Sequence, residues 1–149
     1  MSQALQSGTR AGRLDALLAR YSHDHQNPTN QALHTICVPV IFWCAIALFW
    51  SLHPVVAIVV AVLAGAYYFS LSQRWGLAMG VFMAAGLALA AVVPYRLWVA
   101  LALFVLAWIG QFVGHAIEGR RPSFLDDLKF LLIGPLWVLI KALRLGGRT

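Results

Sequence analysis

The most constraining feature of the chain is a long apolar stretch from which charge is almost absent. Residues 36–111 contain only two charged side chains, Arg74 and Arg96. Over the whole chain 61% of residues are hydrophobic and 11% are charged, and mean hydropathy is +0.78. Soluble domains carry about a quarter charged residues. We therefore expect a single all-α integral membrane domain, because helices satisfy their own backbone hydrogen bonds in lipid.

Short polar turns divide the apolar stretch into four segments. The turns fall at His53-Pro54, at residues 72–75 and at residues 94–96, and the expected spans are residues 33–52, 55–71, 76–93 and 97–117. Each span has about 17–21 residues, or roughly 26–31 Å as a helix, which is enough to cross a bilayer core. The sequence thus predicts a four-helix membrane bundle.

The N-terminal residues 1–24 predict an amphipathic helix. Apolar residues recur at helical spacing among arginines, at Leu14, Leu17, Leu18 and Tyr21. That pattern is typical of a helix that lies on a membrane surface. The formal net charge is +6, and the basic residues flank apolar segments rather than forming one face. Anionic lipid headgroups are therefore the expected partner, and nucleic acid is not.

The C-terminal residues 124–143 are apolar but interrupted by Gly134-Pro135. A fifth crossing here would carry Lys141 and Arg144 to the far side of the membrane, against the positive-inside tendency. We expect a re-entrant or interfacial helical segment instead.

Two polar clusters border the apolar stretch, one from His25 to His34 and the other from Gln111 to Glu118. Four crossings return the chain to its starting side, so both clusters should face the same membrane surface. Most basic residues fall on that side, which makes it cytoplasmic. His53 falls at the opposite end. In a bacterium the membrane would be the inner membrane, and in a eukaryote the endoplasmic reticulum.

Each polar cluster also contains residues that predict local structure. Asn27 followed by Pro28 is typical of a helix start, with proline in the first turn. Gly110 and Gly114 are spaced to let another helix approach closely beside His115.

The side chains of these clusters favour a metal site. Taken singly, such a histidine is more often an interfacial side chain than a ligand. Three at one membrane level, His25, His34 and His115, favour ligation, because neutral imidazole is the commonest metal ligand. Amides and a carboxylate accompany them as candidates for catalysis or for orienting the metal ligands, namely Asn27, Asn30, Gln111 and Glu118. Such a site suits iron, zinc, copper or nickel.

Two other functions fit the same residues. The histidines could hold Zn²⁺ and activate water in a lipid hydrolase. A non-enzymatic metal-binding or lipid-binding protein is the second alternative. A transporter fits less well, since the middles of the spans carry no ionisable residue.

The paired motifs resemble a known family. They read Tyr21-x3-His25-x-Asn27-Pro28-x-Asn30-x3-His34 and Gln111-x2-Gly114-His115-x2-Glu118-x3-Pro122. This pattern resembles the small membrane proteins related to the fungal 2-hydroxy fatty acid dioxygenase of phytosphingosine breakdown. The resemblance implies an Fe²⁺-dependent enzyme that uses dioxygen to shorten a 2-hydroxy fatty acid by one carbon.

The resemblance also implies roles for single residues. The essential histidines of the family match His25, His34 and His115, whereas His23 matches no motif position and is at most an extra ligand. Arg120 or Arg121 would meet the substrate carboxylate, although arginines at a span end are more often plain membrane anchors.

Overall fold

The computed structural model describes residues 9–119 and 130–146. Within these ranges the chain is helical and contains no strand; its helices are α2 (Arg10–Asp24), α3 (Pro28–Leu52), α4 (Pro54–Leu71), α5 (Gln73–Val92), α6 (Arg96–Glu118) and α8 (Ile133–Gly146). Helices α3 to α6 are each long and apolar enough to cross a membrane. The predicted all-α bundle, with four helices long and apolar enough to span a membrane, is therefore confirmed.

Side-chain caps explain where the helices begin. The Asn27 side chain accepts hydrogen bonds from the backbone N–H groups of Thr29 (2.9 Å) and Asn30 (3.3 Å), and Pro28 occupies the first helical position of α3. This cap confirms the helix start predicted at Asn27-Pro28. His53 caps α4 in the same way at the opposite end of α3.

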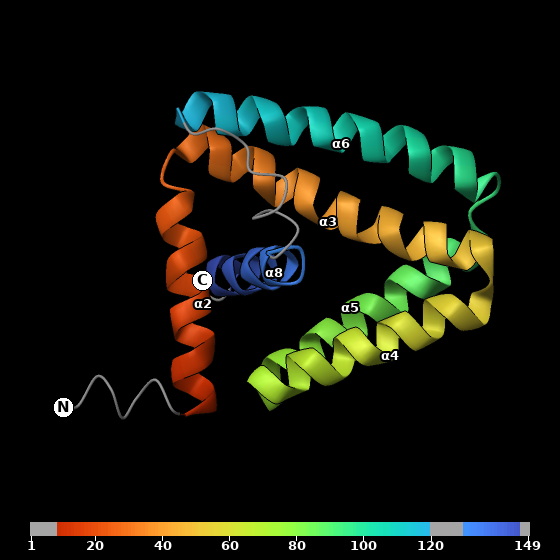
Figure 1. Ribbon diagram of the computed structural model, residues 1–149, viewed down its shortest axis with the longest axis horizontal. Helices are drawn as coiled ribbons and strands as arrows, with labels where there is room; N and C mark the ends of the chain where they lie inside the picture. The colour runs from red at the N-terminus through yellow and green to blue at the C-terminus, as the bar shows by residue number, and fades with distance from the viewer. Residues whose placement is uncertain (1–8, 120–129, 147–149) are drawn as a thin grey trace.

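The bundle consists of two antiparallel pairs, α3 with α6 and α4 with α5 (Figure 1). The pairs meet near the α3–α4 turn and diverge toward their other end. Helix α8, seen nearly end-on in Figure 1, lies between the diverging pairs and contacts α2, α3 and α5. Helix α2 runs across the same open end. The N-terminal helix, the C-terminal helix and the polar start of α3 therefore lie together at the open end of the bundle.

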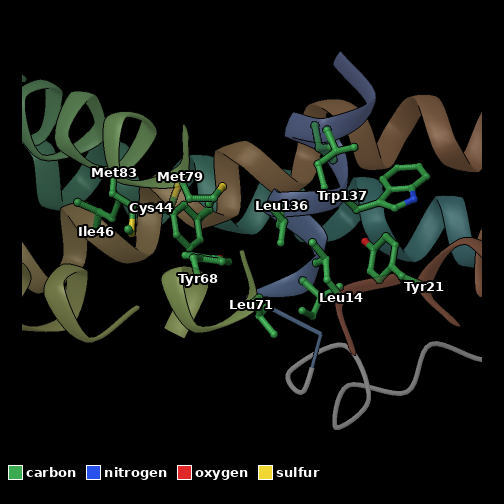
Figure 2. Packing of buried hydrophobic residues seen from close by; sticks show 14 of the residues in the cluster. Leu14, Tyr21, Cys44, Ile46, Tyr68, Leu71, Met79, Met83, Leu136 and Trp137 are labelled. Carbon is green, nitrogen blue, oxygen red and sulfur yellow. The ribbon is translucent and has the colours of Figure 1, made fainter. Parts of the chain in front are cut away.

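Helix α2 is amphipathic as expected, but protein covers its apolar face. Leu14 and Tyr21 are buried, and Figure 2 shows both beside α8 residues Leu136 and Trp137. The arginines of α2 lie on the exposed face. The apolar face that we expected to lie on the membrane surface thus packs inside the molecule.

Helix α8 is buried because it fills the opening between the two pairs. Residues Ile133 to Val138 are all buried. Its 14 residues span about 21 Å, less than a bilayer core. The Tyr68 hydroxyl of α4 donates a 2.7 Å hydrogen bond to the Leu132 carbonyl just before α8. Its apolar composition is therefore explained by burial in protein. The first part of the predicted segment, residues 124–129, lies outside the described residues.

Helices α3 and α6 touch where glycine permits it. A Cβ atom on Gly110 would lie 2.6 Å from the Cys37 sulfur, and one on Gly114 would overlap the Asn30 side chain. The close approach predicted at these two glycines is confirmed, and it holds the start of α3 against the end of α6.

Candidate metal centre

Three buried histidines from three helices meet at the open end of the bundle. His25 ends α2, His34 lies on α3 and His115 lies in the last turn of α6. One potential ligand nitrogen from each lies within 4.8 Å of the others. The ring centroids are 4.3 Å apart for His25 and His34, 5.1 Å for His34 and His115, and 5.7 Å for His25 and His115. The convergence predicted by counting membrane spans is therefore observed.

Backbone carbonyls fix two of the three rings. The His25 Nδ1 atom lies 2.8 Å from the Tyr21 carbonyl, and the His34 Nδ1 atom lies 3.0 Å from the Asn30 carbonyl. A carbonyl only accepts, so in each neutral ring Nδ1 carries the proton and Nε2 carries the lone pair. Held in this tautomer, an imidazole is ready to bind a metal through Nε2.

Glu118 ties the end of α6 to the loop that carries His25. Its carboxylate accepts hydrogen bonds from the backbone N–H groups of Gln26 (3.0 Å) and Asn27 (2.8 Å) and from the Asn30 side chain (3.0 Å). Three donors from the loop and from α3 satisfy the negative charge. These contacts orient the carboxylate toward the backbone of the loop, which gives Glu118 a positioning role beside the histidines.

Asn30 links the parts of the centre. It is fully buried; its carbonyl accepts from His34, its side-chain amide donates to Glu118, and the same side chain packs on Gly114. Asn27 acts one turn earlier as the cap of α3. The two asparagines therefore place His34 and the loop before α3, which explains their regular spacing in the sequence.

Aromatic side chains cover the histidines on the side of α8. The Tyr21 ring stacks on His25, with centroids 4.3 Å apart and planes 18° from parallel. The ring centroids of Trp137 and Tyr21 are 5.3 Å apart, and Figure 2 shows the two side chains next to each other. The Trp137 indole N–H donates a 2.8 Å hydrogen bond to the Ser22 hydroxyl. Sequence analysis named Tyr21 as the first residue of the paired motifs but gave it no role in the site, and it missed Trp137. Tyr21 precedes His25 by one helical turn, a spacing that signals such a contact, whereas no sequence signal brings Trp137 here.

A small cavity adjoins the centre. Its volume is about 40 Å³, and it is lined by Tyr21, His34, Val38, Ile41, Trp108, Gln111, Phe130, Leu131 and Gly134. Gln111 is 5% exposed, and its Nε2 atom has no hydrogen-bond partner among the described residues. The cavity thus combines the imidazole of His34 and the amide of Gln111 with the side chains of Tyr21 and Trp108 and with apolar walls.

The remaining candidates fall elsewhere. The His23 side chain is 69% exposed, lies beside Asp24 and is absent from the histidine trio. The structure therefore does not bring His23 into the centre. His53 lies at the far end of α3, as expected. Arg120 and Arg121 lie outside the described residues.

Comparison with known proteins extends these observations. A family model described as 2-hydroxy-palmitic acid dioxygenase Mpo1-like matches residues 12–144. The 2-hydroxy-palmitic acid dioxygenase MPO1 of Saccharomyces cerevisiae is 32% identical over 143 residues, which cover 87% of this chain and 79% of the yeast protein. No solved structure matches the chain. The family match includes all three converging histidines and all four apolar helices, and the chain belongs to the family of Mpo1-like 2-hydroxy-palmitic acid dioxygenases.

Proposed function

We propose that this protein is an iron(II)-dependent dioxygenase that shortens 2-hydroxy fatty acids by one carbon at the membrane interface. The observation that carries the proposal is the convergence of His25, His34 and His115 in a chain of this family. One hydroxy acid and one dioxygen would give the acid one carbon shorter, carbon dioxide and water, which balances atoms and electrons.

The donor set fits iron(II). Three neutral imidazoles suit a divalent first-row metal, and three protein ligands leave coordination positions for other molecules. Nitrogens on one such ion lie within about 4 Å of one another, so small side-chain adjustments would close the trio on a metal. When bound, iron(II) would supply the one-electron chemistry that reaction with dioxygen requires.

The chain's own residues prepare this site. The Tyr21 and Asn30 carbonyls hold the tautomers of His25 and His34. Glu118 fixes the loop between α2 and α3. The Tyr21 and Trp137 rings shield the histidines with apolar surface, which limits access of water.

The position of the centre suits a lipid substrate. It lies at the polar end of α3 and α6, both of which are long enough to span a membrane. The same open end carries exposed basic residues of α2, including Arg13 and Arg20. We infer that this end faces the cytoplasm, since basic residues favour that side. A fatty acid could then keep its chain in the bilayer while its carboxyl end reaches the histidines.

Oxygen consumption and metal analysis test the proposal together. Purified protein loaded with iron(II) should consume dioxygen with 2-hydroxypalmitate and form pentadecanoate, and it should do neither with palmitate, which lacks the hydroxyl. Protein that retains zinc, needs no dioxygen and cleaves a lipid ester or amide would instead establish the hydrolase alternative. Protein that binds no metal would exclude both enzymes.

A further inference from the structure

The cavity beside His34 contains a polar group that the proposed metal centre leaves unexplained. Gln111 is buried, and its Nε2 atom has no hydrogen-bond partner among the described residues. Leaving a buried amide donor without a partner is unfavourable. A donor kept at such a cost beside a cavity indicates a ligand that accepts a hydrogen bond there.

The polar and the apolar lining residues of the cavity lie at different depths along α3 and α6. His34 and Gln111 mark its polar end, and Val38, Ile41 and Trp108 are among its apolar walls. Along α3, Ile41 lies two turns, or roughly 10 Å, deeper than His34. Trp108 likewise lies almost one turn deeper than Gln111 along α6. The polar end therefore faces the membrane surface, and the apolar walls lead toward the bilayer interior.

The geometry points to this cavity as the site for the carboxyl end of a 2-hydroxy fatty acid, with the Gln111 amide donating a hydrogen bond to the substrate carboxylate. Ile41 and Trp108 line the path of the first chain carbons. This inference rests on the proposed function. The volume of the cavity, about 40 Å³, is roughly three times the minimum that one water needs. The cavity therefore fits a carboxyl-sized group.

An uncharged donor suits this role. A hydrogen bond to a charged carboxylate is stronger than one between neutral groups. Glutamine supplies it without introducing a second buried charge into the bundle. Gln111 lies one turn before His115 on the same face of α6, so it can bind the carboxylate while the histidines act on the adjacent carbon.

Binding of a water-soluble substrate analogue tests the role of Gln111. The probe is 2-hydroxyhexanoate, titrated calorimetrically into iron(II)-loaded protein under nitrogen. We expect Gln111→Leu to weaken binding on the order of 10- to 100-fold, the loss typical of one hydrogen bond to a charged group. Gln111→Glu should weaken it further through charge repulsion. Binding of neutral 1,2-hexanediol and bound iron should stay unchanged in both variants.

A matched pair of substitutions tests the apolar path. Ile41→Phe narrows the cavity, whereas Ile58→Phe makes the same change on α4, where Ile58 is 45% exposed and outside the cavity lining. We expect Ile41→Phe to weaken the binding of 2-hydroxyhexanoate at least tenfold more than the binding of 2-hydroxypropanoate, because the shorter chain ends before it reaches residue 41. Ile58→Phe should bind both acids as the wild type does. Ile41→Ala, which removes rather than adds bulk, should not discriminate against the longer acid.

The outcomes separate this inference from the proposed function. Wild-type binding in Gln111→Leu, or loss of its iron, would overturn the carboxylate role, even if the wild type consumes dioxygen with 2-hydroxypalmitate. Equal weakening of both acids by Ile41→Phe would overturn the chain path. A wild-type protein that holds iron but consumes no dioxygen would overturn the proposed function, while binding of 2-hydroxyhexanoate through Gln111 would still be measurable.

Discussion

The α3–α6 pair and the α4–α5 pair are alike in hydropathy and unlike in what they bury. In the most apolar 18-residue segment of each helix, mean hydropathy is 2.2 for α3 and 2.1 for α6. The corresponding values are 2.1 for α4 and 2.0 for α5. The buried polar side chains of the spans nevertheless concentrate at the contact between α3 and α6, namely Asn30, His34, Gln111 and His115. Among the described residues, α4 and α5 bury mainly small and apolar side chains.

Polar groups inside a membrane bundle are costly and mark function. The contact between α3 and α6 carries the histidines, whereas α4 and α5 act as a support. Tyr68 illustrates the support, since its hydroxyl binds the chain just before α8 and helps to hold that helix in the open end. Hydropathy therefore identifies the apolar helices, and only the polar residues within them distinguish the pair that contributes to the candidate metal centre.

The largest effect should distinguish His34, which lies on α3, from His53, which caps the far end of that helix. His34→Ala removes a ring from the buried trio, whereas His53→Ala removes only the cap at the far end of α3. We expect His34→Ala to lose bound iron and oxygen consumption almost completely, and His53→Ala to retain both. Metal analysis and an oxygen electrode provide the measurements. Full iron content in His34→Ala would contradict a site at the contact between α3 and α6.

A glycine in each pair gives the second contrast. A Cβ on Gly114 would overlap the Asn30 side chain, whereas a Cβ on Gly80 would meet nothing within 4 Å. We expect Gly114→Ala to lower the free energy of unfolding by about 1–3 kcal/mol, as overpacking does, and to reduce iron binding by displacing Asn30. Gly80→Ala should be neutral or raise stability by up to ~1 kcal/mol, because alanine favours helix. Denaturation in detergent and metal analysis would show the difference; equal effects would refute it.

Sequence alone predicted much of this arrangement. Apolar length and turn residues gave the four spans, and Asn27-Pro28 gave the start of α3. Counting crossings brought His25 and His34 to His115, although they are far apart in the chain. These inferences succeed because membrane helices obey simple rules of length and backbone satisfaction.

What sequence could not predict depends on packing between distant elements. The apolar face of α2 was expected on the membrane surface, but α8 covers it, because an amphipathic pattern does not say what the apolar face will meet. Trp137 reaches the tyrosine over His25 from more than a hundred residues away. Glu118 was expected to take part in catalysis or to orient the histidines, and only the folded structure shows its bonds to the loop backbone.

Loss of the Glu118 carboxylate should have an intermediate effect. Glu118→Ala removes the acceptor for two backbone N–H groups and for the Asn30 amide, so the loop before α3 loses its anchor. We expect metal affinity to fall about 10- to 100-fold, as when other outer-shell partners are removed. Asp24→Ala is the matched control, because it removes one negative charge from the same end without touching these bonds. A similar fall in Asp24→Ala would attribute the effect to general charge.

The smallest effect should come from the hydrogen bond that joins α8 to α2. Ser22→Ala removes the acceptor of the Trp137 indole N–H, and Trp137→Phe removes the donor while keeping an aromatic ring over Tyr21. We expect the pair to contribute about 0.5–1.5 kcal/mol to stability, measured as the coupling energy of a double-mutant cycle. Metal affinity should not change in Ser22→Ala, because the His25 and His34 tautomers are held by backbone carbonyls. A fall in metal affinity would show instead that α8 helps to orient the centre, and would extend the functional region from the α3–α6 contact to the C-terminal helix.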